Sequence, residues 1–438
     1  MSLTKPQILK GTRDFLPEKL INRQNIIEAI RRIFESFGFS PIDTPAFEYL
    51  ETLEGKYGQE GDKLIYKFTD HGGRKIALRY DLTVPLSRVI AMHPEITKPF
   101  KRYHIAPVWR ADKPQKGRYR EFYQCDVDII GSESMLCDAE VIAVSYYCLK
   151  EIGFDDFIIK INNRKILNGI VNFLGMDENK SQTLFRIIDK LDKIGMSGVE
   201  DELMNSDVPK DKILSFLNLL KLEKKDEELL LELENKLENI PQGIQGLREI
   251  REIMNYLDNM GVEDKNYEFD LTLARGLDYY TGPIFEVVLK KPKIGSISAG
   301  GRYDSLIGVF SKQSFPATGI SIGLERIITV MEEFGMLPSN SLVTQVLVTV
   351  FSQETTGHAL SIATKLRLSG INTEIVLKEG KLSKQLNYAN NKGIPICIII
   401  GPDEIASGEI TLRDMVNNRQ EKVSDENIIK SIKNILGK

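Results

Sequence analysis

Two strand-like stretches separated by a turn-forming segment restrict the possible folds more than any other feature of the sequence. Residues 101–112 and 119–130 are rich in aromatic and β-branched side chains, and residues 113–117 between them contain Pro114 and Gly117. Two such stretches joined by a loop with glycine predict a β-hairpin. We therefore expect an antiparallel pair of strands connected by a long loop.

A row of polar side chains follows one face of the second strand. With a side-chain period of two, four of its residues point the same way: Phe122, Gln124, Asp126 and Asp128. Arg110 stands near the end of the first strand. This face offers a cation for a phosphate, an aromatic ring for a base and acceptors for a small cationic ligand. A solvent-exposed strand could carry similar residues, so the pattern alone leaves both interpretations open.

Composition places the chain among globular proteins of several domains. Its 438 residues correspond to two to four domains at roughly 150 residues each. Hydrophobic residues make up 42% and charged residues 27%, which excludes disordered and fibrous classes. The net charge of -4 gives no argument for a nucleic-acid partner. No apolar run is long enough to span a membrane, and the start of the chain lacks the apolar core of a secretory signal, so we expect a cytoplasmic protein. The four cysteines form no C-x-x-C pair, so we expect no zinc site.

The pattern of the chain indicates three regions. The first is expected to contain short strands around a turn within 64–78 and helices at 17–37, 83–92 and 137–152. Residues 166–260 are mostly helical in pattern and highly charged, which predicts a helical insertion with solvated faces. Strand patterns return at 269–290 and 294–301, before a helix at 323–334. After a linker at 338–343, strands at 345–351, 372–377 and 395–400 alternate with helices at 357–369 and 381–392, which is typical of an α/β domain.

Arginines in two further segments stand beside small or aromatic residues. One segment is 275–282, Arg-Gly-Leu-Asp-Tyr-Tyr-Thr-Gly, and the other is 319–326, which ends in Arg326. Three arginines in three separate segments suit a polyphosphate, because a guanidinium group binds phosphate through two parallel hydrogen bonds. The alternatives are a tyrosine-rich strand and a surface arginine paired with an acid. Walker A, G-x-G-x-x-G and H-E-x-x-H motifs are absent from the sequence.

Together these segments resemble the histidyl-tRNA synthetases, which are class II aminoacyl-tRNA synthetases. Residues 109–124 resemble class motif 2, residues 323–326 resemble motif 3, and residues 39–53 with Pro45 resemble the dimer-forming motif 1. The segment that begins at Arg275 and the segment Ala-Gly-Gly-Arg-Tyr-Asp at 299–304 resemble elements specific to the histidine enzyme and its relatives. The similarity covers nearly the whole chain.

The resemblance implies an α+β fold. An antiparallel-sheet catalytic domain would comprise residues 1–165 and 261–337, with a helical insertion domain at 166–260 that clasps tRNA. An α/β anticodon-binding domain would follow at 343–438. From residue 341 onward there are 12 Lys and Arg against 10 Asp and Glu. Charge alone therefore gives no sign of RNA binding in that domain, and base stacking and edge contacts would have to supply specificity.

The resemblance also implies the ligands. ATP with Mg²⁺ would be held by Arg110 at the α-phosphate, Phe122 on the adenine, Asp112, and Arg326 on the γ-phosphate side. Asp112 stands where many bacterial members have glutamate. Arg275 resembles the family's histidine-specific arginine near the α-phosphate and carboxylate. For histidine, the resemblance implies these residues: Asp81, Thr83 and Gln124 at the ammonium group, Asp128 and Tyr280 at the imidazole, and Tyr279 and Tyr303 around it.

The implied activity is that of a histidine–tRNA ligase, with Arg110, Arg275 and Arg326 as catalytic residues. Histidine would be activated to histidyl-adenylate and transferred to the 3′ end of tRNA(His) by a homodimer formed through motif 1. Two alternatives stay open: a non-catalytic paralogue, either a regulatory subunit in histidine biosynthesis or a sensor of tRNA or histidine, and a plain binding module. Such paralogues tend to lose the arginines or the C-terminal domain, and this chain keeps both.

Overall fold

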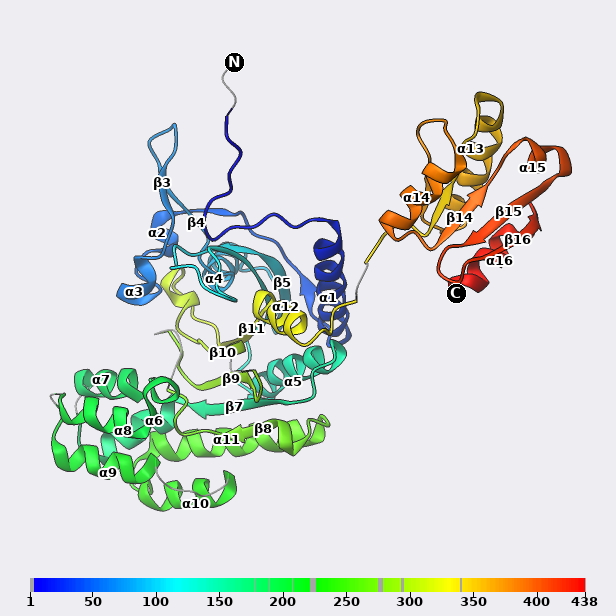
Figure 1. Ribbon diagram of the computed structural model, residues 1–438. Helices are drawn as coiled ribbons and strands as arrows, with labels where there is room; N and C mark the ends of the chain where they lie inside the picture. The colour runs from blue at the N-terminus through cyan, green and yellow to red at the C-terminus, as the bar shows by residue number, and fades with distance from the viewer. Residues whose placement is uncertain are drawn as a thin grey trace. The chain divides into compact units, whose positions relative to one another are not determined.

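The structure, a computed structural model, describes residues 4–176, 178–188, 190–206, 208–220, 226–274, 279–292, 295–338 and 341–437. The chain divides into two compact units (Figure 1). The larger unit comprises Met1–Asp14 and Asn25–Met336, and the smaller one comprises Phe15–Gln24 and Leu337–Lys438. Helix α1 (Pro17–Ser36) has residues in both.

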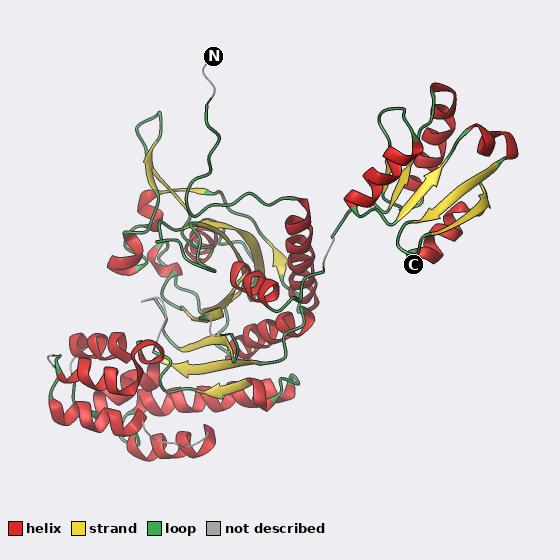
Figure 2. Cartoon of the chain, in the orientation of Figure 1, coloured by secondary structure: helices red, strands yellow, loops and turns green. Residues whose placement is uncertain are grey.

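An eight-stranded sheet forms the centre of the larger unit (Figure 2). Its strands, in spatial order, are β1 (Ser40–Pro41), β5 (Phe100–Trp109), β6 (Glu121–Ile130), β11 (Ala317–Gly323), β10 (Ser296–Arg302), β9 (Pro283–Leu289), β7 (Phe157–Asn163) and β8 (Tyr267–Phe269). Its six central strands pair antiparallel, and only the outermost strands β1 and β8 pair parallel with their neighbours. The predicted hairpin is confirmed as β5 and β6, with Arg102 directly opposite Asp128.

Shorter elements complete this part of the larger unit. A three-stranded sheet contains β2 (Phe47–Tyr49), β4 (Lys75–Leu78) and β3 (Lys67–Thr69). The helices are α2 (Leu50–Leu53), α3 (Gly58–Asp62), α4 (Thr83–Met92), α5 (Met135–Glu151) and α12 (Leu324–Glu333), with 3₁₀ turns η1 (Asp264–Asn266) and η2 (Ile307–Val309). Helix α5 begins where the Ser134 side chain accepts a hydrogen bond from the Leu136 amide, which satisfies an otherwise unpaired donor of the first turn. The buried side chains of α5 hold it against β11 and α11.

Six helices lie beside the β7–β8 edge of the sheet (Figure 2). They are α6 (Arg164–Phe173), α7 (Glu178–Ile188), α8 (Leu191–Met204), α9 (Lys210–Leu220), α10 (Asp226–Lys236) and α11 (Pro241–Asn259). The helical character expected for this charged stretch is present in its described residues. Two glycine contacts let α6 and α11 approach closely: a Cβ at Gly169 would lie 2.8 Å from Gly243 Cα, and one at Gly246 would lie 2.9 Å from the Ile166 nitrogen.

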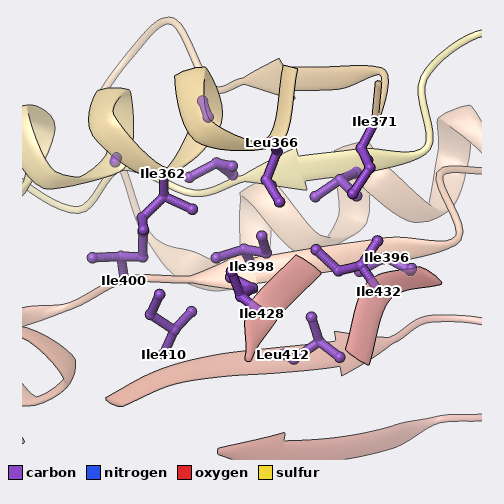
Figure 3. Close-up of a cluster of buried hydrophobic side chains, with 14 of the residues drawn as sticks. Ile362, Leu366, Ile371, Ile396, Ile398, Ile400, Ile410, Leu412, Ile428 and Ile432 are labelled. Atoms are coloured by element: carbon purple, nitrogen blue, oxygen red, sulfur yellow. The ribbon is translucent and has the colours of Figure 1, made fainter. Parts of the chain in front are cut away.

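The smaller unit contains a five-stranded sheet with helices on both faces. Its strands are ordered β13 (Thr373–Ile375), β12 (Val346–Val348), β14 (Ile396–Ile399), β15 (Glu409–Asp414) and β16 (Arg419–Ser424). Its helices are α13 (Gln353–Leu368), α14 (Leu382–Lys392), α15 (Pro402–Ser407) and α16 (Ile428–Ile435). Alternation along β14 sends Ile396 and Ile398 to the core shared with α13 and α16 (Figure 3), whereas Cys397 packs with Ala389 of α14.

Some sequence expectations need correction. The strand expected over 269–290 is wrong for the described residues of its first half, because β8 ends at Phe269 and neither 270–274 nor 279–282 is a strand before β9 begins at Pro283. Tyr279 and Tyr280 therefore do not lie on a strand, and the tyrosine-rich strand is excluded. The hairpin β15–β16 and helix α16 were not anticipated, although Ile428, Ile432 and Ile435 recur at helical spacing in α16. Within the described ranges, no helix has both the length and the apolar character needed to cross a bilayer.

The close contact between α6 and α11 makes Gly246 a sensitive position. We expect Gly246→Ala to lower the unfolding temperature, because a methyl group 2.9 Å from a backbone nitrogen forces the helices apart, which costs about 1–3 kcal/mol. Scanning calorimetry measures this change. Gly357→Ala in α13 is the matched control: nothing lies within 4 Å of its Cβ position, so alanine's helix propensity should stabilise the smaller unit by up to about 1 kcal/mol. An unfolding temperature for Gly246→Ala at or above that of the wild type would contradict the packing argument.

Candidate active site

A cavity of about 420 Å³ lies over one face of the central sheet in the larger unit. The polar row of β6 forms part of its wall, together with residues of β9, β10 and β11. The sequence-predicted site residues within the described ranges all line this cavity: Asp81, Thr83, Arg110, Asp112, Phe122, Gln124, Asp128, Tyr279, Tyr280, Tyr303 and Arg326. Arg275 lies outside the described residues.

Glycines on the neighbouring strands let the wall of this cavity pack closely around Asp128. Gly319 on β11 pairs with Asp128 on β6, and a Cβ at Gly319 would lie 2.0 Å from Asp128 Oδ1. A Cβ at Gly300 on β10 would lie 2.1 Å from the Gly319 oxygen. Real Cβ contacts are never this short, so any larger residue at either position would displace a strand or the Asp128 carboxylate.

At its inner end the cavity holds a buried carboxylate with two partners. Asp128 Oδ2 lies 2.5 Å from Nη2 of Arg102, a residue with no exposed surface, and Oδ1 accepts a hydrogen bond from the Tyr303 hydroxyl. Burial raises the pKa of Asp128, and Arg102 and Tyr303 oppose that rise. This inner end of the cavity is lined by the Asp128 carboxylate, which is a hydrogen-bond acceptor, and by the rings of Tyr279 and Tyr303, whose centroids are 5.9 Å apart. It suits a small ring that donates a hydrogen bond.

Beside this end lie two buried acceptor atoms without hydrogen-bond partners in the described part of the chain. Asp81 Oδ1 accepts from the Tyr57 hydroxyl (3.0 Å) and the Val84 amide (3.1 Å), which leaves Oδ2 unpaired. Gln124 Nε2 donates to Ser321 Oγ (2.7 Å), which leaves Oε1 unpaired. Buried acceptors are normally satisfied, so these atoms point to a ligand with several donors.

The other end carries guanidinium groups and an aromatic ring. Arg110 lies between two rings: its central guanidinium carbon is 4.3 Å from the centroid of the Tyr80 ring and 5.1 Å from that of Phe122. Its Nε donates a hydrogen bond to the backbone carbonyl oxygen of Tyr80 (3.1 Å). Arg326, in the first turn of α12, donates a hydrogen bond to the backbone carbonyl oxygen of Ser296. These contacts hold the positive charges in place before any ligand binds, which suits an anion such as a polyphosphate.

Several residues of the site were missed from the sequence. Arg118 Nε and Nη2 donate to the two oxygens of Asp112 (3.0 and 2.9 Å), so Asp112 orients another cation of the cavity wall. Glu325 accepts from Arg13 and from the Tyr123 amide (3.3 Å), which ties the N-terminal segment and β6 to α12. Arg118 and Glu325 stand inside the quoted motifs, but only the fold shows what they contact.

Arg102 was missed for a different reason. It belongs to the strand pattern of 101–112, and nothing in the sequence shows that a charged residue there has no exposed surface. In the segment 299–304, Tyr303 reaches the cavity, whereas Arg302 points to the buried Asp138 on α5. Arg102 therefore supports the ligand pocket, whereas Arg302 supports the fold.

Comparisons with known proteins extend over both units. A family model described as histidyl-tRNA synthetase matches residues 11–327, and one described as an anticodon binding domain matches residues 345–435. The histidine–tRNA ligase of Cytophaga hutchinsonii is 42% identical over 98% of this chain and 99% of its own length. That of Aeropyrum pernix is 41% identical over 99% of each chain.

Solved structures show the same relationship. The histidyl-tRNA synthetase from Nostoc sp. PCC 7120 superposes with a TM-score of 0.89 at 33% identity, over 99% of this chain and 100% of that one. A protein from Bacillus halodurans described as an ATP phosphoribosyltransferase regulatory subunit/histidyl-tRNA synthetase gives a TM-score of 0.75 at 26% identity, over 89% and 98%. On these sequence and structural matches, the chain belongs to the histidyl-tRNA synthetase family.

Proposed function

We propose that this protein is a histidine–tRNA ligase. It activates histidine with ATP to give histidyl-adenylate and pyrophosphate, and it then transfers the histidyl group to the 3′ end of tRNA(His). The observation that carries this proposal is the division of one cavity into two ends. Fixed guanidinium groups and Phe122 lie at one end, and buried acceptors lie at the other.

The guanidinium end is the proposed ATP site. Arg110 binds the α-phosphate, Arg326 lies on the γ-phosphate side, and Phe122 stacks on the adenine. Asp112 contributes by holding Arg118 in the wall of the same cavity. Mg²⁺ ions enter with ATP as part of the substrate and neutralise phosphate charge.

The acceptor end is the proposed histidine slot. The ammonium group of histidine meets Asp81, Thr83 and Gln124, and the imidazole meets Asp128 and Tyr280, with Tyr279 and Tyr303 around the ring. A slot that pairs the ring nitrogens rejects analogues without them by about 10⁴–10⁵, since the buried polar groups of the protein would then be left unpaired.

Activation in this cavity is largely a matter of placement. The carboxylate of histidine attacks the α-phosphorus in line and pyrophosphate leaves, while negative charge grows on the non-bridging oxygens. Arg110 is already held by Tyr80 and Phe122, so it stabilises that charge without moving. Holding both reactants in one cavity removes most of the entropic cost of their encounter. By its resemblance to the family's histidine-specific arginine, Arg275 is assigned to the same phosphate and carboxylate.

The remaining parts of the chain fit transfer to tRNA. In this proposal residues 1–165 and 261–337 catalyse both steps, the helical insertion at 166–260 clasps the tRNA, and residues 343–438 bind the anticodon. A homodimer forms through residues 39–53, in the cytoplasm. The competing proposal is a regulatory subunit, favoured by the similarity to the Bacillus halodurans protein. Arg110 and Arg326 in one cavity favour catalysis.

Amino-acid-dependent exchange of pyrophosphate into ATP separates the two functions. We expect exchange with histidine and Mg²⁺ at least about 10⁴-fold faster than with any other standard amino acid, because only imidazole satisfies both ends of the slot. Purified protein without histidine-dependent exchange, but with measurable histidine binding, would support the regulatory function instead.

Arg110→Ala should leave the protein folded and slow histidine-dependent exchange by about 10²–10³ in kcat, since a fixed cation at the developing charge is lost. Arg31→Ala is the control, because Arg31 is an exposed residue of α1 that pairs only with Glu28 (2.6 Å) in the described residues. Equal rates for both variants would exclude Arg110 from the reaction.

Asp128→Asn should raise the KM for histidine by about 10–100-fold and change the KM for ATP little, because it removes a charged acceptor next to the imidazole. Steady-state exchange at varied histidine and ATP provides both constants. Asp155→Asn, at an exposed position, is the control. A parallel rise in both constants would show that the substitution disturbs the cavity as a whole.

A further inference from the structure

Asp126 is a buried carboxylate of the cavity that the proposed mechanism does not use. It lies on β6 between Gln124 and Asp128, with 2% of its surface exposed, and it lines the same cavity. In the sheet it stands opposite His104 on β5 and Ser321 on β11. Its Oδ1 atom has no hydrogen-bond partner in the described part of the chain. An unpaired buried carboxylate oxygen is costly unless a ligand satisfies it.

Besides Asp128 Oδ2, which lies against Arg102, three buried acceptors of this part of the cavity have no hydrogen-bond partner in the described residues. They are Asp81 Oδ2, Gln124 Oε1 and Asp126 Oδ1. An ammonium group has three N–H donors and no acceptor, so it can satisfy buried acceptors of this kind. Asp81 and Gln124 are already assigned to it together with Thr83, and those contacts leave Asp126 Oδ1 unsatisfied. That buried oxygen thus indicates a further contact to the ammonium group.

The charges around Asp126 determine whether it holds a proton. The titratable groups around it come from several elements: Arg102 and His104 on β5, Asp128 on β6, Asp81 before α4, and Tyr280. Glu286 on β9 lines the same cavity. Burial raises the pKa of Asp126 most, Asp128 and Asp81 raise it further, and Arg102 and a hydrogen bond from Ser321 lower it, which places it at about 7. His104 stays neutral at that pH because burial, Arg102 and Arg79 lower its pKa to about 4.

We propose that Asp126 is a further ligand of the histidine ammonium group, beside Asp81, Thr83 and Gln124, and that it releases its proton to solvent when histidine binds. This inference rests on the proposed function. A cation beside a carboxylic acid favours the ionised form, so ligand and proton compete for the same group. Histidine therefore binds more weakly as the pH falls below 7, and each binding event releases a proton from the fraction of molecules in which Asp126 is protonated.

Calorimetric titration of the full-length protein tests this release. Titrations at pH 7 in two buffers with different ionisation enthalpies give the number of protons released. Because the imidazole of histidine also titrates near this pH, the probe is an analogue with a neutral 1,2,4-triazole ring, and histidine itself is titrated in parallel. We expect the wild type to release a fraction of a proton per site, because an acid whose pKa lies near the working pH is partly protonated. Asp126→Asn should release none and bind roughly ten- to a hundredfold more weakly.

Ser321→Ala is a second variant that keeps the carboxylate in place. It removes the hydrogen bond that lowers the pKa of Asp126, so proton release should reach its midpoint at a higher pH than in the wild type. This measurement decides the question even where Asp126→Asn fails to fold. Binding without proton release, or the same release in wild type and Asp126→Asn, overturns the role of Asp126. A midpoint unchanged in Ser321→Ala also counts against it. Absence of any histidine binding would instead overturn the proposed function.

Discussion

The ion pair between Arg102 and Asp128 is the interaction on which the inner end of the cavity depends. Both side chains are buried, and the pair forms because β5 and β6 align with these residues directly opposite each other. Removing one partner of a buried pair costs about 3–5 kcal/mol, since the other charge is left without compensation. A shift of one residue in register would place the two groups on opposite faces of the sheet. The hairpin register therefore fixes the position of the carboxylate that we assign to the imidazole.

From that point the cavity changes character along its length. Carboxylates and an amide oxygen line the inner part, and arginines held by backbone oxygens and aromatic rings line the outer part. A zwitterion placed between them directs its ammonium group inward and its carboxylate outward, toward the phosphates. The glycines of β10 and β11 let the strands and the Asp128 carboxylate take these positions, because a Cβ at Gly300 would clash with the Gly319 oxygen and one at Gly319 would clash with Asp128 Oδ1. Orientation of the substrate thus follows from where the sheet places charge and where it omits side chains.

The sequence predicted the parts of this arrangement that depend on local pattern. Helix α4 has the predicted bounds, and the hairpin β5–β6 carries the predicted polar row. The sequence could not show contacts between residues that are far apart in the chain. The partners of Asp128, for example, come from β5 and from the loop after β10, and no periodicity connects them.

A crystal structure of the protein with histidine and a non-hydrolysable ATP analogue tests the central claim most directly, namely that one cavity holds both substrates in reacting order. The account predicts the imidazole against Asp128, the adenine on Phe122, and the histidine carboxylate next to the α-phosphate at Arg110. Density for histidine outside this cavity, or with its ring toward Arg110 and its carboxylate toward Asp128, would contradict the account.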